Sequence, residues 1–222
     1  MRITKFGHSC LFVEEGEAKI LIDPGSYCFL DQPLQPEDLP ECNVLLLTHE
    51  HPDHTYPEAI RKIRESGIMN QESGLILTNV DVQKILHEQG IESEVLDRGE
   101  ERTVYGVAIR GVACDHGHIA DHVPRCENVG FVIAGKLFHP GDCVAPSENV
   151  QAEILAVPVV APWMAVREGL EFVKKLKPRA VIPIHDGFLK WPERPWYKIF
   201  ETGLKDTSIE FVPLKIGEGR EF

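Results

Sequence analysis

Residues 44–54, VLLLTHEHPDH, place an apolar run directly before a dense group of polar side chains. The run VLLL is continuous rather than alternating, which is typical of a strand buried on both faces. In the spacing H-x-H-x-D-H that follows, His49 and His51 occupy alternate positions of an extended segment, so both imidazoles face one side. Asp53 and His54 turn back toward the same point. Imidazole and carboxylate groups bind Zn²⁺ and related ions, so the stretch predicts a metal site at a strand end. A solvated polar turn is the alternative interpretation.

Hydrophobic periodicity predicts two groups of strands, each followed by helices. The first group has strands at 2–6, 10–15, 19–23, 43–48, 74–78 and 91–96, with helices at 57–66 and 79–89 and a Pro-rich surface loop at 26–40. The second has strands at 103–114, 128–134, 136–139, 152–160, 179–184 and 209–216, with helices at 167–176 and 194–203. This order predicts an α/β fold in which two stacked mixed sheets are flanked by helices, a four-layer αβ/βα sandwich. We expect residues 1–222 to form one domain.

Composition narrows the class of partner and the cellular location. The formal net charge of −12 argues against a nucleic-acid or anionic-membrane partner, because phosphate binding requires clustered Lys and Arg. No apolar run approaches the length of a membrane span, and the first ten residues, MRITKFGHSC, lack the apolar stretch of a secretory signal. We therefore expect a cytoplasmic protein. The six cysteines contain no C-x-x-C pair and are expected to be reduced and structural, which predicts a metal site of nitrogen and oxygen ligands only.

The polar motif resembles the H-x-H-x-D-H signature of the metallo-β-lactamase superfamily. Four further stretches, GHSC, LIDPG, LFHPGD and IPIHD, resemble in order the elements of a small subgroup of that superfamily that includes ascorbate-phosphate lactonases. Together these stretches span almost the whole chain. The resemblance implies the metallo-β-lactamase fold, which is the sandwich predicted above.

The resemblance also implies two divalent metal ions, with Zn²⁺ as the default and Mn²⁺ or Fe as alternatives. The first ion would be held by His49, His51 and a later histidine, and the second by Asp53, His54 and His185, with Asp142 bridging both. His185 comes at the end of a predicted strand, as His49 does, and Asp142 follows Gly141, where the backbone can turn sharply.

Three histidines compete for the remaining position of the first site. The stretch CDHGHIADH offers His116, His118 and His122. His116 comes first after a predicted strand and fits the subgroup's pattern better than His118. His122 is then left without a role as a ligand.

Several neighbouring residues have both a functional and a structural interpretation. His8 and Asp23 are expected to orient metal ligands through hydrogen bonds, although Asp23 could simply cap a Pro-Gly turn. His139 is expected to be a buried hydrogen-bonding residue beside the bridging position. Trp163 either lines a substrate pocket or packs in the hydrophobic core. Arg125 is a candidate for binding an anionic group of the substrate.

The implied activity is hydrolysis of a small ester or lactone, phosphorylated or not, by a hydroxide that two metal ions activate. Asp53 is the catalytic candidate, because it could orient that hydroxide and carry its proton to the leaving group. A phosphodiesterase is the first alternative, and a non-catalytic metal-binding or di-iron redox or sensor protein is an alternative of another class. We expect a small anionic substrate, no nucleic-acid or membrane partner, and a chain compatible with a homo-oligomer.

Overall fold

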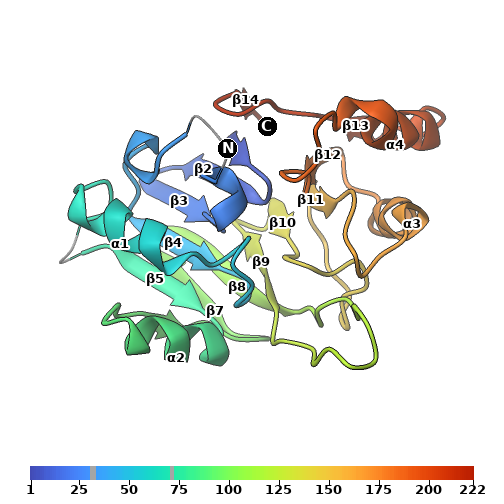
Figure 1. The fold of residues 1–222 in the computed structure, drawn as a ribbon. Coiled ribbons are helices and arrows are strands. Elements are labelled where there is room, and N and C mark those ends of the chain that lie inside the picture. Colours follow the sequence, from blue (N-terminus) through green and yellow to red (C-terminus); the bar gives the residue numbers. More distant parts are fainter. Residues whose placement is uncertain (31–33, 71–72) are drawn as a thin grey trace.

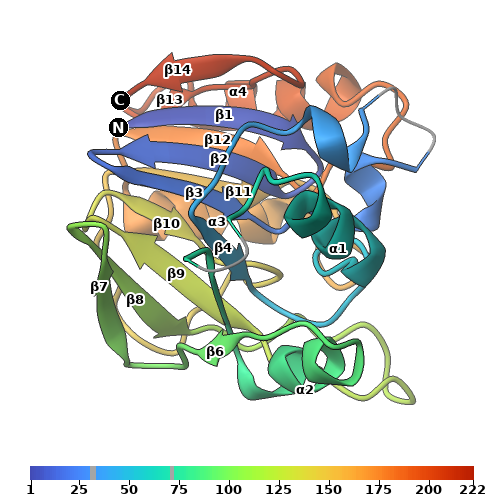
Figure 2. The same ribbon diagram turned by 90° about the vertical axis from the view of Figure 1, so that its left-hand side faces the viewer.

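The computed structural model describes residues 1–30, 34–70 and 73–222, and two sheets dominate it (Figure 1). In the described residues the strand orders are β14-β1-β2-β3-β4-β5-β6 and β13-β12-β11-β10-β9-β8-β7, seven strands in each. Helices cover the outer face of each sheet, and the inner faces pack together (Figures 1 and 2). This arrangement confirms the predicted four-layer αβ/βα sandwich.

The first sheet changes from antiparallel to parallel pairing across its width. Strands β14, β1, β2 and β3 pair antiparallel, and β3, β4, β5 and β6 pair parallel. The bounds are β1 Arg2–Gly7, β2 Cys10–Glu15, β3 Ala18–Ile22, β4 Val44–Leu47, β5 Leu75–Thr78, β6 Glu94–Val95 and β14 Gly219–Glu221. All four residues of β4 are buried, as expected for a strand that helices cover on one face and the second sheet covers on the other.

The second sheet repeats this change of pairing. Strands β7 to β10 pair antiparallel, and β10 to β13 pair parallel. The bounds are β7 Glu101–Val104, β8 Val107–Ala113, β9 Val129–Ile133, β10 Leu137–His139, β11 Ile154–Pro158, β12 Ala180–Ile184 and β13 Glu210–Phe211. A tight turn joins β9 and β10, with Ala134 and Gly135 at φ 54° and 65°.

Three apolar clusters fill the spaces between the layers. The central cluster joins the inner faces of the sheets and includes Leu46, Phe131 and Ile182. A second lies under α1 (Pro57–Glu65) and α2 (Val80–Glu88), and a third lies under α3 (Val166–Leu176) and α4 (Lys198–Leu204). No helix of the described residues is long and apolar enough to span a membrane.

The structure differs from the sequence prediction mainly at short elements. The segment expected to be a surface loop contains two 3₁₀ helices, Ser26–Cys28 and Pro36–Asp38, and buries Phe29 and Leu39, while residues 31–33 lie outside the description. The strand predicted at 209–216 ends at Phe211, before Pro213, whose ring cannot donate to a ladder. The strand predicted at 103–114 folds instead into the β7–β8 hairpin.

Candidate metal centre

The loop that follows β4 is fixed by the buried carboxylate of Asp23, which follows β3. Asp23 Oδ1 accepts a hydrogen bond from the Thr48 N–H at 2.8 Å, and Asp23 Oδ2 accepts one from Thr48 Oγ1 at 2.7 Å. The same Oδ2 lies 2.7 Å from Nδ1 of His54, which is also fully buried. Because a buried carboxylate requires such donors, Asp23 holds both ends of the histidine-bearing loop. Its contacts are those expected of a residue that orients ligands.

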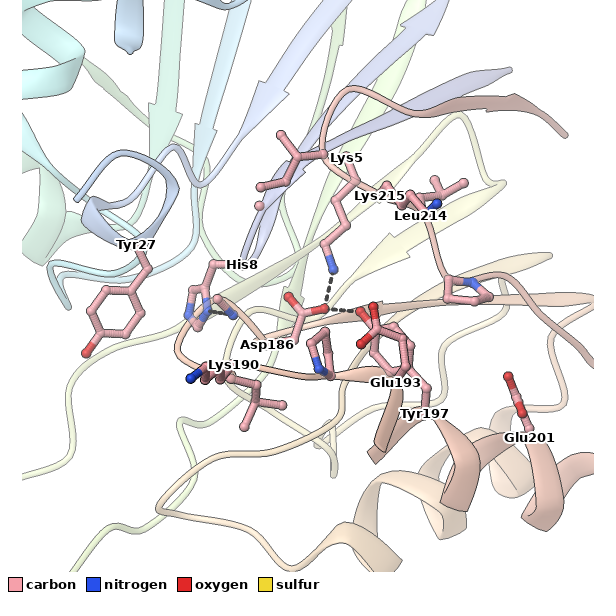
Figure 3. Close-up of a pocket in the computed structure, with 16 residues that line it drawn as sticks. Lys5, His8, Tyr27, Asp186, Lys190, Glu193, Tyr197, Glu201, Leu214 and Lys215 are labelled. Carbon is pink, nitrogen blue, oxygen red and sulfur yellow. Dashed lines mark hydrogen bonds and ion pairs between the residues drawn. The ribbon is translucent and has the colours of Figure 1, made fainter. Parts of the chain in front are cut away.

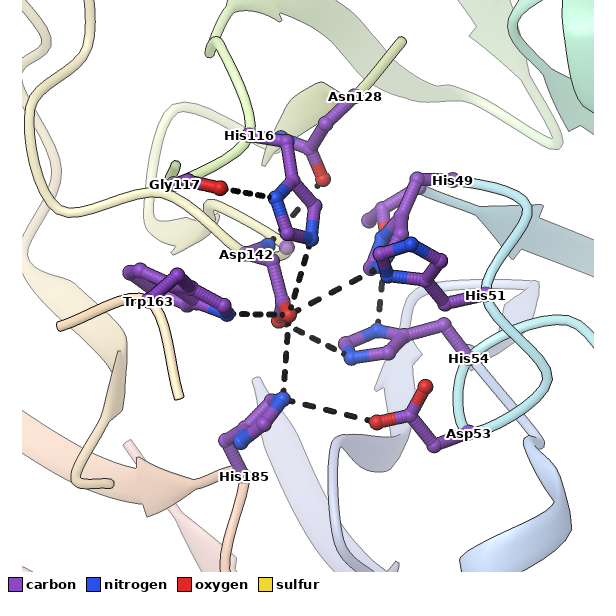
Figure 4. A network of polar contacts seen from close by, with 12 residues as sticks. His49, His51, Asp53, His54, His116, Gly117, Asn128, Asp142, Trp163 and His185 are labelled. Atoms are coloured by element: carbon purple, nitrogen blue, oxygen red, sulfur yellow. Dashed lines mark hydrogen bonds and ion pairs between the residues drawn. The ribbon is translucent and has the colours of Figure 1, made fainter. Parts of the chain in front are cut away.

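Histidines from both sheets converge on the carboxylate of Asp142, which follows β10 and is buried (Figure 4). The Nε2 atom of His54 lies 3.0 Å from Oδ1, and the Nε2 atoms of His185, His116 and His49 lie 3.1, 3.4 and 3.9 Å from Oδ2. Gly141, at φ 60°, permits this approach, since a Cβ there would lie 2.2 Å from Asn128 Oδ1. Asp142 is therefore the point where the strand ends of the two sheets meet.

Several atoms that face the centre are buried and lack hydrogen bonds within the protein. Among the described residues, the buried Nε2 atoms of His54, His116 and His185 and Asp142 Oδ1 make no hydrogen bond. Each unpaired buried polar atom costs about 1–3 kcal/mol. Several such atoms at one point are explained if a cation lies between them.

The opposite ring nitrogens are paired, as those of metal ligands usually are. The Nδ1 atoms lie 3.0 Å from Thr48 Oγ1 for His49, 2.7 Å from Asp23 Oδ2 for His54, 2.6 Å from Gly117 O for His116 and 2.7 Å from Val160 O for His185. These acceptors hold the rings so that Nε2 points inward. The donor set fits a metal centre.

Among the described residues, candidate ligand atoms fall into three groups, and within each group all atoms lie within 4.8 Å of one another. The groups are His49, His51, His116 and Cys126; His8, Asp53, His54 and His185; and His49, His54 and Asp142. The structure thus brings together all seven residues that the sequence analysis named as ligands. Cys126 was not expected there, because no cysteine spacing indicates a ligand and only folding brings it to the histidines.

The buried histidines and carboxylates of the cluster shift one another's pKa values. Burial lowers the pKa of His49 well below its usual value. Burial also opposes a charge on His54, but Asp142 and Asp23 outweigh it and raise the His54 pKa well above its usual value. Likewise, burial would raise the pKa of Asp142, but His185 and His54 hold it well below its usual value. His54 and the carboxylates thus favour each other's charged forms.

His8 and His139 are buried beside the centre and have different neighbours. His8 Nε2 lies 3.1 Å from Asp53 Oδ2, and its Nδ1 accepts a hydrogen bond from the Gly187 N–H at 3.0 Å. Burial lowers the His8 pKa to about 4, so the neutral ring donates to Asp53. His139 Nε2 donates to Ser9 O at 2.9 Å, and its Nδ1 accepts from the Gly141 N–H at 3.3 Å. His139 thus braces the backbone next to Asp142.

Burial distinguishes the three histidines that compete for the first site, and it also distinguishes the two residues that could contact substrate. His116 is 3% exposed and faces Asp142, whereas His118 and His122 are exposed. The indole Nε1 of Trp163 donates to Asp142 Oδ2 at 2.8 Å, so this side chain lines the centre. Arg125 is exposed in the loop after His116.

A cavity of about 510 Å³ adjoins the centre and shares His8 with it (Figure 3). Its lining includes Tyr27 and a buried polar network around Asp186. Lys5 Nζ donates to Asp186 Oδ2 at 2.6 Å, and the Tyr197 hydroxyl donates to the same oxygen. The cavity offers room for a small molecule beside His8, and none of the seven candidate ligands lines it.

Comparisons with known proteins agree with this arrangement. A family described as the beta-lactamase superfamily domain matches residues 2–185. The Mycobacterium tuberculosis protein Rv0786c is 27% identical over 219 residues, which cover 96% of this chain and 97% of the relative. A UPF0173 metal-dependent hydrolase of Natranaerobius thermophilus is 26% identical over 209 residues, covering 88% of this chain and 86% of the relative.

A solved structure shares the fold. Igni18, a metallo hydrolase from the archaeon Ignicoccus hospitalis, superposes with a TM-score of 0.77 at 22% identity and covers 100% of this chain and 98% of its own. The match over most of the sequence, the two sheets and the histidine and aspartate cluster lead to one assignment. The chain belongs to the metallo-β-lactamase superfamily and is a metal-dependent hydrolase of that fold.

Proposed function

We propose that this centre binds two divalent metal ions and hydrolyses a small ester or lactone. One ion is assigned to His49, His51 and His116, the other to Asp53, His54 and His185, and Asp142 lies between them. Zn²⁺ is the default, and Mn²⁺ or Fe suits the same donors. The observation that supports the proposal is the set of buried, inward-facing Nε2 atoms without hydrogen bonds, whose opposite ring nitrogens are paired.

Divalent ions in such a centre lower the pKa of water to near neutrality and polarise the oxygen of the attacked group. The protein's own contribution is to hold the ligand atoms in place. Trp163 fixes Asp142 Oδ2 with its indole N–H, and Asp23 fixes His54. These contacts hold the ring and carboxylate planes before substrate arrives.

Asp53 is the residue best placed to move a proton. Its side chain is 20% exposed, against 3% for Asp142, so substrate can reach it. Burial opposes its charge, but the hydrogen bond from His8 and the neighbouring histidines outweigh it and hold its pKa below the usual range. With Oδ2 facing His8, we assign Oδ1 to take the proton of the attacking water and pass it to the leaving oxygen.

The substrate is proposed to be small and to carry one or two negative groups. The chain has a net charge of −12, which repels long polyanions over a Debye length of about 8 Å at physiological salt. Two divalent ions would outweigh Asp53 and Asp142 and leave a positive centre inside this negative surface. Arg125, exposed after His116, is proposed to contact the anionic group.

A substrate series tests this proposal. Turnover is compared for a phosphorylated or carboxylated lactone, its neutral counterpart, a small phosphodiester and an oligonucleotide, at low and moderate salt. We expect the anionic lactone to have the highest kcat/KM. Efficient cleavage of the phosphodiester would favour the alternative activity, and efficient cleavage of the oligonucleotide or a higher kcat/KM for the neutral lactone would contradict the substrate assignment.

Elemental analysis of Asp142→Ala tests the centre itself. We expect the variant to lose the second metal and nearly all turnover, because the carboxylate on which four histidines converge is gone. Asp206→Ala, at an exposed aspartate, serves as the control and should match the wild type. Only trace transition metal in the wild-type protein after purification without chelators would refute the metal centre.

A further inference from the structure

Cys126 is a sulfur neighbour of three of the proposed ligands. Its Sγ and one ring nitrogen from each of His49, His51 and His116 all lie within 4.8 Å of one another. The other five cysteines are buried, whereas Cys126 is only partly buried. Its side chain therefore lies beside the histidine cluster, partly open to solvent, and not in one of the apolar clusters.

The backbone around Cys126 is fixed by hydrogen bonds to the site loop. Two residues on, buried Asn128 donates through Nδ2 to Cys114 O at 2.8 Å and Pro140 O at 3.0 Å, and its Oδ1 accepts from the Asp142 N–H at 3.1 Å. Asn128 also pairs with His49 in an isolated antiparallel bridge. The position of Cys126 is thus set by the same contacts that hold the ligands.

A metal ion bound beside this sulfur would hold it as a thiolate, because a coordinating thiol gives up its proton. The unpaired Nε2 of buried His116, in the same group, indicates independently that a ligand-binding position lies here.

We propose that Cys126 Sγ is a further protein ligand of the ion assigned to His49, His51 and His116. The proposal rests on the proposed function, since it requires that ion. On binding, the sulfur–metal bond forms and the thiol proton passes to bulk water. Thiolate favours Zn²⁺ over Mn²⁺, and zinc can expand beyond four ligands, which would keep a position for the attacking water. Substrate would approach from the side of Asp53, whose side chain is 20% exposed.

X-ray absorption at the zinc edge of the fully loaded protein tests the ligand directly. Sulfur bound to zinc lies at about 2.3 Å, whereas nitrogen and oxygen ligands lie at about 2.0–2.2 Å. We expect a sulfur contribution in the wild type and in the control Cys42→Ala, which removes a buried core thiol. Cys126→Ser should lose that contribution. The wild-type spectrum decides the question even if the variant folds poorly.

A metal competition gives a second readout. With equal zinc and manganese supplied, we expect the zinc-to-manganese ratio bound by Cys126→Ser to fall below that of the wild type and of Cys42→Ala. Zinc bound with nitrogen and oxygen neighbours only in the wild type would overturn the sulfur ligand and leave the proposed function standing. Manganese bound in place of zinc by the wild type would also overturn the sulfur ligand, and failure of the wild type to bind any transition metal would overturn both.

Discussion

His116 and His118 show how two residues of one loop have different surroundings. The His116 ring is held by Gly117 O and faces Asp142, whereas the His118 side chain is exposed. The sequence favoured His116 because it comes first after a predicted strand and fits the pattern of the subgroup that the chain resembles. Burial in the structure supports the same choice.

Paired alanine substitutions at these positions test the choice. We expect His116→Ala to lose about one metal ion per chain, because it removes one nitrogen from the first site and leaves a gap beside Trp163. His118→Ala should keep the wild-type metal content and turnover. Metal content by elemental analysis decides between them, and loss of metal in His118→Ala alone would mean that the assignment is reversed.

The linear motif was readable from the sequence because its ligands lie within a few residues of one another. His185 and Asp142 were assigned through the family resemblance, supported by the strand end before His185 and by Gly141 before Asp142. The position of Cys126 could not be predicted, because it depends on Asn128 bonding to three other segments. The hydrogen bond from Trp163 to Asp142 could not be predicted either, since an aromatic residue after a strand can equally fill core.

At the scale of elements, the N-cap residue of helix α2 stabilises the helix and also holds two loops of the candidate metal centre. Asn79 Oδ1 accepts from the N–H groups of Asp81 and Val82, and its Nδ2 donates to Thr48 O at 3.0 Å and Glu127 O at 3.1 Å. One side chain thus caps the helix and joins the two loops that carry His49 and Cys126. The sequence predicted a helix from residue 79 but did not predict the contacts of Asn79 with the loops.

Substitutions of Asn79 separate its two contributions. Asn79→Ala should lower the free energy of unfolding by about 1–3 kcal/mol, because the cap is lost and Glu127 O loses a donor. Asn79→Ser keeps a cap acceptor and should cost less. Urea denaturation of the metal-free variants measures the difference. Equal losses in the two variants would show that the helix cap contributes little.

The elements that the sequence missed are those that depend on distant partners. Strand β14 is short and polar and exists because Gly219–Glu221 pairs with β1 at the other end of the chain. Strands β6 and β13 are likewise short edge strands, shorter than the apolar runs that predicted them. Long apolar strands and capped helices can be recognised from local sequence patterns. Short edge strands form because a neighbouring strand pairs with them, and the local sequence does not show this.

At the scale of the whole molecule, metal binding and folding are coupled, because the unfolded chain has no preformed site. We expect chelation to lower the Tm and zinc to restore it. Zinc at 100 times its Kd would add about 2.7 kcal/mol of stability, or roughly 5–10 °C for a chain of this size. Calorimetry with and without chelator measures the shift. Asp142→Ala should show a much smaller one, and an equal shift would place the stabilising ion elsewhere.

The candidate ligands come from both sheets. His49, His51, Asp53 and His54 follow β4 of the first sheet, while His116, Asp142 and His185 follow β8, β10 and β12 of the second. The sheets also meet through apolar contacts of the central cluster, which have no preferred direction, and through a few polar contacts such as Lys5 Nζ to Pro183 O at 2.8 Å. Metal ions held by all these residues would act as cross-links, so the mechanical force needed to slide one sheet over the other would depend on the supply of metal.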